Sequence, residues 1–466
     1  MARKSCIKCS MELSGKNIHI VGICGVSLSA LAVLLSCEGA RVTGSDLDET
    51  EAARLRTLGI TVFVGHRKEN ILSDADMVVF SSAIGDDNPE LIEAKRRGLV
   101  LLSRAELLSE ISKKYGCVIA VAGSHGKTTT TAMIASMLID AGLNPTVHVG
   151  GWFSKIGGNV RVGSKAYFVT EACEYKNNFL KLCPDMAVIL NVQADHLDFF
   201  KTFAGVVKGF FSFAQKIKHD GALIYNADDP NINFPEGVNA VGFSVENGGD
   251  INAANIKMQR NGTYSFDCIF DGSTLGRVHL SVCGEHNIKN ALATILVGLH
   301  LGIDFKTIAK SVGAFCGVDR RFQFLGTING AAVYSDYAHH PTEIKASIKT
   351  AKSFTAGKIL AVFQPHTYTR TAAFFDDFIS SVADADERAF YSIFPARERP
   401  MSGITHTALA QKSCKLGLNA RAIDDKNALF KLIAEFAAPN NTILLLGAGN
   451  MQNLCKDLKF DEKYHK

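Results

Sequence analysis

The apolar positions of this 466-residue chain fall into short runs that alternate with longer, helix-like segments. A strand is predicted for "NIHIVGICG", which starts at Asn17, and an apolar helix for "LSALAVLLSCEG". A second strand is predicted to end in "VTGSD", and this order of strand, helix and strand predicts a βαβ unit of the doubly wound kind. The alternation continues through the strand "DMVVFSSAI" to the helix "RAELLSEISKKYG". This part of the chain therefore predicts a Rossmann-like domain.

Two further segments repeat the alternation of strands and helices. The second segment opens with the strand "CVIAVAG" and continues through "KAYFVTEA" and "DMAVILNV". Near Asp250 the pattern changes, and "GTYSFDCIFDGSTLGRVHLSV" predicts antiparallel strands around a "DGS" turn. The helix "NIKNALATILVGLHLG" closes this segment, and a third runs from around Arg320 to the strand "TILLLGAGN". We predict an α/β protein of three domains, 1–112, 113–315 and 316–466, of which the last is again Rossmann-like.

A glycine-containing loop joins the first strand of the middle segment to the helix that follows it. The loop and the start of this helix read "GSHGKTT", which comprises Gly123, Ser124, His125, Gly126, Lys127, Thr128 and Thr129. Backbone amides and a helix N-terminus attract phosphate, Lys127 can reach the β- and γ-phosphates, and the Thr128 hydroxyl can hold magnesium. An ordinary glycine turn is the alternative, but the flanking strand and helix favour a P-loop ATPase domain. Without an "NKxD" string for guanine, ATP is the predicted nucleotide.

Charge and cysteine content exclude several classes of protein. The chain has 50 basic and 46 acidic residues, so its balance of +4 does not predict a nucleic-acid-binding surface. Twelve scattered cysteines are typical of free thiols in a reducing compartment. Cys6 and Cys9 form a single CxxC without a second pair, which does not predict a zinc site. Since no apolar run is long enough to cross a membrane, we expect a cytoplasmic protein with no membrane partner. We also expect a monomer or weak homodimer.

Carboxylates and a histidine follow two more predicted strands of the middle segment. Glu171 and Glu174 follow one strand, and His196 and Asp198 follow the next. In open α/β sheets the carboxyl ends of strands face the nucleotide crevice. Together with Thr128, Glu171 and His196 are therefore predicted to bind Mg²⁺, although a lone histidine is more often structural. Glu174 and Asp198 are expected at the surface or behind the ligands.

The third segment supplies positive charge and imidazoles at the ends of its predicted strands. The groups are Arg320, Arg321, His339, His340, His366 and Arg370. Such groups can neutralise a transferring phosphoryl group or bind a carboxylate, although each alone could be a solvated surface residue. Three clusters in one domain favour a functional role. We expect this domain to close over the ATP that the middle domain holds.

Taken together, these strings resemble the Mur ligase family over nearly the whole chain. The strings that carry the resemblance are "GSHGKTT", "EACEY", "NVQADHLD", "GEHNIKNALA", "DRRFQ", "DYAHHPTEI" and "FQPHTYTRT", in family order. "GICGVSLSALA", "GSD" and "SSAI" match the family's UDP-sugar-binding N-terminal domain. Departures include Cys24, where the family usually has glycine, and Thr367, where many members have a second arginine.

The resemblance implies an ATP-dependent ligase of peptidoglycan precursor synthesis. The reaction implied joins L-alanine to the lactyl carboxylate of UDP-N-acetylmuramate through an acyl phosphate, giving ADP and phosphate. The catalytic residues implied are Lys127, Glu171, His196, Arg321, His339, His366 and Arg370. The substrate-binding residues implied are Gly22, Gly25, Ser27, Ser45, Asp46, Ser81, Ser82 and Tyr337. Asn287 and Asn290 are implied to bind adenine, although Asn287 could instead cap a helix.

Three alternatives remain open from the sequence. A sister ligase would attach a preformed tripeptide or a later amino acid. A nicotinamide-dependent oxidoreductase is suggested by "GICGVS" after the first strand, but its spacing is not GxGxxG and a second nucleotide loop follows at Gly123. A non-catalytic nucleotide-binding switch would use the same phosphate loop without turnover.

Overall fold

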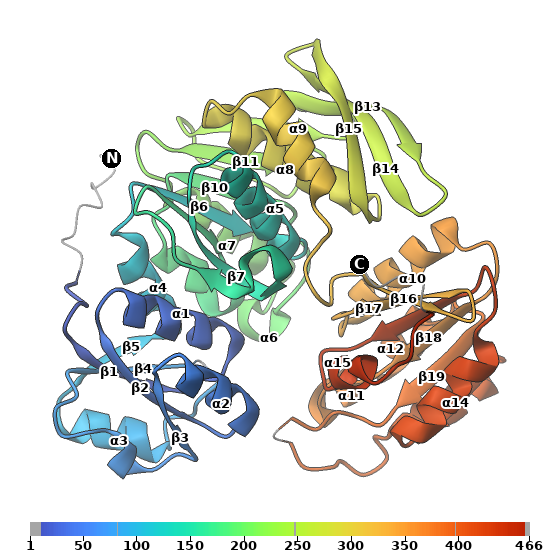
Figure 1. The fold of residues 1–466 in the computed structure, drawn as a ribbon, viewed down its shortest axis with the longest axis horizontal. Coiled ribbons are helices and arrows are strands. Elements are labelled where there is room, and N and C mark those ends of the chain that lie inside the picture. The colour runs from blue at the N-terminus through green and yellow to red at the C-terminus, as the bar shows by residue number, and fades with distance from the viewer. Residues whose placement is uncertain (1–10, 82, 247, 397, 462–466) are drawn as a thin grey trace. The chain divides into compact units, whose positions relative to one another are not determined.

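The computed structural model describes residues 11–81, 83–246, 248–396 and 398–461, and the side chains of Thr50, Asp198 and Gln452 are not described. Cys6, Cys9 and the predicted substrate residue Ser82 therefore lie outside the described residues. The described chain forms three β-sheets whose strands alternate with helices, which confirms the predicted α/β fold class (Figure 1). The ten cysteines among these residues form no disulfide bond. None of the described helices combines the length and apolar character needed to cross a bilayer.

The chain divides into two compact units. The first unit comprises residues 1–256, 265–280 and 286–315, and the second comprises 257–264, 281–285 and 316–466. The first two sheets belong mainly to the first unit, and the third sheet belongs to the second.

The N-terminal sheet has five parallel strands in the order β3-β2-β1-β4-β5. Its strands are β1 (Asn17–Val21), β2 (Arg41–Asp46), β3 (Thr61–Val64), β4 (Met77–Phe80) and β5 (Val100–Ser103). Its helices are α1 (Val26–Cys37), α2 (Glu49–Thr57), η1 (Lys68–Asn70), α3 (Pro89–Arg96) and α4 (Arg104–Ser112). Alternate residues of β1 serve two cores, because Ile18 and Ile20 pack with α1, α2 and α4, whereas Val21 packs with α3. This is the doubly wound arrangement that the sequence predicted.

The middle sheet has ten strands in the order β15-β14-β13-β12-β11-β10-β6-β9-β7-β8. Its first strands are β6 (Cys117–Ala122), β7 (Thr146–Phe153), β8 (Gly158–Arg161), β9 (Tyr167–Glu171) and β10 (Met186–Ile189). The later strands are β11 (Ala222–Asn226), β12 (Asn239–Ser244), β13 (Ile251–Met258), β14 (Thr263–Phe270) and β15 (Ser273–Cys283). Its helical segments are α5 (Lys127–Asp140), η2 (Ser154–Ile156), η3 (Tyr175–Lys181), α6 (Leu197–Phe200), α7 (Phe203–Ala214), α8 (His286–His300) and α9 (Phe305–Ala314). The phosphate-loop strand β6 lies between the parallel strands β10 and β9.

The predicted hairpin is present at one edge of this sheet. β14 and β15 are neighbours joined by Asp271 and Gly272, both with positive φ (45° and 72°). A two-residue loop can join only antiparallel strands, and positive φ at both positions matches their right-handed twist.

The first two sheets share one hydrophobic core. The same cluster of buried side chains contains Leu31 and Leu108 from the N-terminal sheet's helices and Phe168 and Phe179 from the middle segment. Helix α1 also contacts β7 and β8, and α4 contacts η3. This shared core explains why the two sheets form one compact unit.

The third sheet has six strands in the order β16-β17-β21-β18-β19-β20, and only its β16–β17 pair is antiparallel among the described strands. Its strands are β16 (Gln323–Ile328), β17 (Ala331–Asp336), β18 (Ile359–Phe363), β19 (Glu387–Tyr391), β20 (Ala420–Ile423) and β21 (Thr442–Leu446). Its helices are α10 (Pro341–Phe354), α11 (Tyr368–Ala373), α12 (Phe375–Ser381), α13 (His406–Lys415), α14 (Lys426–Phe436) and α15 (Met451–Lys456). Separate hydrophobic cores, one around Phe363 and one around Leu445, cover the two faces of the sheet.

Candidate active site

The phosphate loop between β6 and α5 depends on two glycines with positive φ. Gly123 has a φ of 143° and Gly126 a φ of 87°. A Cβ at Gly126 would lie 3.0 Å from Asn290 Oδ1 and 3.1 Å from the Leu190 side chain, which is closer than an ordinary contact. A larger residue would therefore strain the backbone and push the loop from its neighbours.

Asn191, two residues after β10, holds this loop from the side. Its Oδ1 accepts a hydrogen bond from His125 N at 2.8 Å, and its Nδ2 donates to His125 O at 3.0 Å. Its carbonyl accepts from Ser124 N at 3.1 Å. With these two loop amides committed to Asn191, the N-terminus of α5 is the end of the loop whose geometry suits an anion. Sequence reasoning gave Asn191 no role, although a polar residue at a strand end beside a glycine loop was a usable signal.

Lys127 starts α5, and its ammonium contacts a buried carboxylate. Nζ lies 2.9 Å from both Oε1 and Oε2 of Glu174, and it also donates to the carbonyls of Gly123 and Ser124. Burial alone would lower the pKa of Lys127, but the Glu174 carboxylate outweighs it, so the pKa is raised and the ammonium stays charged. The Glu174 side chain is only 1% exposed, so of the two expected places, at the surface or behind the ligands, the surface is excluded. The turn into η3 carries this carboxylate inward.

Three possible metal ligands meet beside Lys127. The donor atoms of Glu174, Asp195 and His196 all lie within 4.8 Å of one another. His196 Nε2 is 3.8 Å from Glu174 Oε1 and 3.8 Å from Asp195 Oδ2. Glu171 is outside this group of three, and its Oε1 instead accepts a hydrogen bond from Gly150 N at 2.6 Å. The structure thus groups His196 with Glu174 and Asp195, whereas the sequence predicted Glu171 as its partner.

The two asparagines predicted to bind adenine lie in the first turn of α8 and are buried. Asn290 Nδ2 donates to Asn287 Oδ1 at 2.9 Å, and Asn290 Oδ1 faces Gly126 of the phosphate loop. Asn287 is the second residue of α8, directly after His286. Beside them, burial and the nearby His125 lower the pKa of His286 to about 4.

The glycine loop after β1 lies against the end of β4. A Cβ at Gly22, whose φ is 81°, would lie 3.3 Å from the Ser81 Cβ. The Gly25 amide donates to the Gly22 carbonyl at 3.2 Å, which closes the loop into a turn. The structure therefore brings together Gly22, Gly25 and Ser81, three of the residues implied to bind the sugar nucleotide.

Ser45 and Asp46, which end β2, are already engaged within the protein. The Ser45 hydroxyl is fully buried, 2.5 Å from Glu90 Oε2 and 3.0 Å from His66 Nδ1. Asp46 Oδ2 accepts from Cys24 N at 2.9 Å and holds the glycine loop. These contacts make Ser45 part of a buried network, which the sequence could not reveal because Glu90 is 45 residues away.

Arginine, tyrosine and histidine side chains gather after β17 and β18 in the second unit. The guanidinium carbons of Arg320 and Arg321 lie 4.4 and 5.4 Å from the Tyr337 ring centroid. The His339 ring centroid is 5.3 Å from that of Tyr337 and 6.5 Å from that of His366. The structure therefore brings these predicted residues together. We call Arg320, Arg321, Tyr337, His339, His366 and Arg370 the basic cluster.

The histidines of the basic cluster are held neutral. Burial lowers the pKa of His366 to about 4, and the positive charge of Arg370 adds to this effect. Burial also lowers the pKa of His339, where Arg370 again opposes protonation while Glu343 favours it. His340 differs from its neighbour, since it caps α10 in a reciprocal capping box with Glu343.

Asp336, at the end of β17, is a buried carboxylate that the sequence analysis missed. Burial raises its pKa to about 6, although hydrogen bonding to Ser347 and the charge of Arg321 work in the opposite direction. Ser347 Oγ donates to Asp336 Oδ2 at 2.6 Å. The string "SDYAHH" contained this carboxylate, and its place at a strand end was the available signal.

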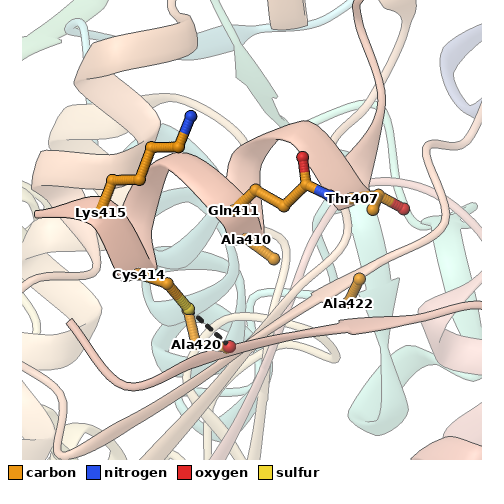
Figure 2. A pocket seen from close by; sticks show the side chains of 7 residues that line it. All are labelled: Thr407, Ala410, Gln411, Cys414, Lys415, Ala420 and Ala422. Carbon is orange, nitrogen blue, oxygen red and sulfur yellow. Dashed lines mark hydrogen bonds between the residues drawn. The ribbon is translucent and has the colours of Figure 1, made fainter. Parts of the chain in front are cut away.

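A shallow apolar pocket of about 360 Å³ lies elsewhere in the second unit, between α13 and β20 (Figure 2). Its lining residues are Thr407, Ala410, Gln411, Cys414, Lys415, Ala420 and Ala422. None of these is a predicted site residue. The Cys414 thiol contacts the Ala420 carbonyl at 3.2 Å.

Comparison with known proteins relates all three sheets to one family. Residues 17–115 match the sequence profile of the Mur ligase family catalytic domain, residues 121–298 that of the Mur ligase middle domain, and residues 320–449 that of the Mur ligase glutamate ligase domain. A UDP-N-acetylmuramate–L-alanine ligase from Clostridium kluyveri is 41% identical over 447 residues, covering 94% of this chain and 97% of the relative.

Two solved structures extend this comparison to the fold. The UDP-N-acetylmuramate–alanine ligase of Thermotoga maritima has a TM-score of 0.80 at 28% identity and covers 94% of this chain and 97% of its own. A murein peptide ligase from Psychrobacter arcticus has a TM-score of 0.70 at 25% identity and covers 96% and 100%. With family profiles matched in all three sheets and 41% identity over nearly its full length, the chain belongs to the Mur ligase family.

Proposed function

We propose that this chain is an ATP-dependent ligase that joins L-alanine to the lactyl carboxylate of UDP-N-acetylmuramate. The observation that carries the proposal is the Lys127–Glu174 pair at the start of α5, in a chain that is 41% identical to a ligase of that name. A carboxylate does not condense with an amine at neutral pH because it is a poor electrophile. ATP hydrolysis alone would not need the basic cluster or the glycine loop after β1.

The reaction proceeds in two steps. A lactyl carboxylate oxygen attacks the γ-phosphorus, the bond to the β-phosphate oxygen breaks, and an acyl phosphate and ADP form. The alanine amine, after losing a proton from its ammonium form, then attacks the acyl carbon. The carbon–oxygen bond to phosphate breaks, and the amide forms as the nitrogen loses a second proton to the departing phosphate, while the first proton goes to solvent. Both steps bring anions together, so positively charged groups must offset their repulsion.

Lys127 acts on the phosphates. Its ammonium is placed by Glu174 and by the Gly123 and Ser124 carbonyls, and its raised pKa keeps it charged. A bound triphosphate offers a competing set of anionic oxygens at the N-terminus of α5, where the helix dipole also favours negative charge. We infer that Lys127 moves from Glu174 toward the β- and γ-phosphates when ATP binds.

Glu174, Asp195 and His196 are the residues that fit a magnesium ion. Two carboxylates and an imidazole converge within 4.8 Å, and carboxylate oxygens are ligands that Mg²⁺ prefers. When bound there, the ion would offset charge on the γ-phosphate and the attacking carboxylate. Thr128 and Glu171 stay candidates for ligands of the nucleotide-bound ion, since Thr128 is the second residue of α5 and Glu171 adds its charge near Lys127.

The basic cluster serves the same reaction. The guanidinium groups of Arg321 and Arg370 suit a carboxylate or phosphate, because their geometry allows paired hydrogen bonds. His339 and His366 are neutral, so each can accept a hydrogen bond from the alanine ammonium. We propose that these groups bind the amino acid and the transferring phosphoryl group.

Attachment of a preformed tripeptide is the second candidate. The likeness to the murein peptide ligase favours it over the other sister activities. A phosphate-release assay with ATP, Mg²⁺ and UDP-N-acetylmuramate separates the two candidates when it is offered alanine, serine, glycine or a tripeptide. Release that depends on alanine and on the nucleotide sugar supports the proposal. Phosphate release with the tripeptide but not with alanine favours the second candidate. Release when neither alanine nor the tripeptide is offered contradicts both candidates.

A further inference from the structure

A buried histidine on β7, His148, connects the two sheets of the first unit. Its Nε2 lies 2.9 Å from Ser27 Oγ, and its Nδ1 lies 3.0 Å from Thr170 Oγ1. Arg104 Nη1 donates to Ser27 Oγ at 3.2 Å, and Thr170 Oγ1 donates to the Glu171 carbonyl at 3.2 Å. A continuous line of hydrogen bonds therefore runs from α1 to the end of β9. We call Arg104, Ser27, His148 and Thr170 the His148 line.

The protonation state of His148 determines which groups donate and which accept along the His148 line. Burial and the charge of Arg104 lower the pKa of His148 to about 3, so its ring is neutral and has one donor and one acceptor. Since the Thr170 hydroxyl hydrogen is directed at the Glu171 carbonyl, Nδ1 must be the donor and Nε2 the acceptor. Ser27 then donates to Nε2 and accepts from Arg104. Only in this tautomer can the Thr170 hydroxyl accept from Nδ1 while it donates to the Glu171 carbonyl.

The two ends of the line lie at two functional elements. Ser27 is the second residue of α1 and follows the glycine loop of Gly22 and Gly25. Thr170 directly precedes Glu171, whose carboxylate accepts from Gly150 N, two residues beyond His148. A core histidine with only a structural role could make its two hydrogen bonds to any nearby groups, whereas His148 connects the start of α1 to the end of β9.

A second contact fixes the same loop. Asn159, on β8, donates from Nδ2 to the carbonyl of Val26, the residue before Ser27. Both contacts bind the start of α1 to the β7–β8 pair, whose strands contact α1. The Ser27 hydroxyl is therefore engaged by protein groups on both sides, which argues against its predicted role as a direct ligand of the substrate.

We propose that His148 is a positioning residue that fixes the glycine loop before α1 against the strand end that carries Glu171. The proposal rests on the proposed function, in which that loop holds the sugar nucleotide and Glu171 lies beside the phosphates. The reacting carboxylate and γ-phosphorus are held by different sheets, so their alignment depends on this junction. A misplacement of about 1 Å between reacting groups can cost about a hundredfold in rate.

The tautomer is tested first, because it requires no activity. In protein labelled with ¹⁵N-histidine, the His148 resonances are identified among the fourteen histidines by their loss in His148→Phe. We expect a protonated Nδ1, an unprotonated Nε2 and no titration between pH 5 and 8. The opposite tautomer, or titration in this range, would overturn the line.

Kinetics test the positioning role. We expect His148→Phe to lower kcat about tenfold to a hundredfold while the KM values for ATP and L-alanine change less than threefold, which is the signature of lost alignment. Ser27→Ala in the His148→Phe background should cause no further loss, because the line is already broken. His148→Gln, whose amide keeps a donor and an acceptor, should recover part of kcat.

Controls separate this inference from the proposed function. His219→Gln changes an exposed histidine that pairs only with its neighbour Asp220 among the described residues, and it should match the wild type. If the wild type shows no alanine-dependent turnover, the proposed function fails while the NMR result still decides the line. A kcat for His148→Phe equal to that of an active wild type would overturn the positioning role. So would a double variant whose loss in kcat is the product of the losses in Ser27→Ala and His148→Phe.

Discussion

The phosphate loop and the basic cluster handle positive charge in opposite ways. At the phosphate loop, Lys127 is paired with a buried carboxylate, and that partner raises its pKa. In the basic cluster, burial and neighbouring guanidinium charge lower the pKa of His339 and His366, so protonation is suppressed instead. The phosphate loop therefore keeps the Lys127 ammonium charged, and this ammonium can exchange Glu174 for another anion. In the basic cluster the arginines carry the positive charge, and the imidazoles stay neutral.

The difference indicates different ligands. A paired ammonium at a helix N-terminus suits a polyanion that displaces the carboxylate, as a triphosphate would. Arginines beside neutral imidazoles suit a ligand with both a carboxylate and an ammonium group, as an amino acid has. The comparison predicts that variants in the two regions fail at different steps.

The largest effect is expected for Lys127→Ala. Its ammonium donates to the Gly123 and Ser124 carbonyls of the phosphate loop, and in the proposed function it stabilises the transferring phosphoryl group. Loss of such a contact costs about 10²–10³-fold in kcat. Alanine-dependent phosphate release measures this loss, and Lys68→Ala, at an exposed lysine of the same unit, is the matched control. Turnover near the wild-type rate in Lys127→Ala would remove the phosphate-loop assignment.

The next effect separates Glu174 from Glu171. Because Glu174 meets Asp195 and His196 whereas Glu171 contacts Gly150, Glu174→Gln should raise the half-saturating Mg²⁺ concentration by about 10–100-fold. His196→Ala should act in the same direction, and Glu171→Gln should have a smaller effect. Magnesium titrations of turnover provide the test. A larger effect in Glu171→Gln would restore the grouping that the sequence predicted.

Arg370→Ala sharpens the comparison from the other region. It should leave ATP affinity, measured by calorimetry, within about twofold of the wild type, a change of about 0.5 kcal/mol or less, because the proposal has Arg370 act on the transferring phosphoryl group rather than on bound ATP. It should lower kcat about tenfold or more, because a guanidinium binds developing phosphate or carboxylate charge. Equal losses of ATP affinity and of kcat would contradict the division of roles.

The smallest effect concerns acid stability. The folded-state pKa of His366 is about 4, below the ordinary value of 6.5, so unfolded chains bind the proton first on acidification. The stability that neutral His366 contributes is full above pH 6.5 and is lost as the pH falls toward 4. His366→Phe should therefore lose less stability between pH 7 and 5 than the wild type, measured as the urea midpoint by circular dichroism. An identical loss in both proteins would place the titration elsewhere.

Local patterns predicted most of the fold. The strands "CVIAVAG" and "TILLLGAGN" became β6 and β21, because apolar runs that end in glycine specify buried parallel strands with turns after them. The phosphate loop was equally readable, since its strand, glycines, lysine and helix are contiguous. Part of the basic cluster was also predictable, because Tyr337, His339, His366 and Arg370 follow the parallel strands β17 and β18, whose carboxyl ends share one edge of the sheet, whereas Arg320 and Arg321 precede β16.

Tertiary pairing explains what the sequence missed. Glu174 was expected at the surface or behind the ligands, but residues of left-handed conformation at Lys176 and Asn177 bend the chain and bury its carboxylate next to Lys127. Ser45 was expected to bind substrate, but its hydroxyl is committed to Glu90, far away in the sequence. Such partners depend on sheet order and loop path, which no local pattern encodes.

The central claim is that the lactyl carboxylate is activated by phosphorylation, and an oxygen label tests it most directly. UDP-N-acetylmuramate carrying ¹⁸O in both lactyl carboxylate oxygens is incubated with the protein, ATP, Mg²⁺ and L-alanine, and the released phosphate is analysed by mass spectrometry. An acyl phosphate requires one labelled oxygen to leave with each phosphate and one to stay in the amide carbonyl. Phosphate without label, released at the rate of amide formation, would contradict the account.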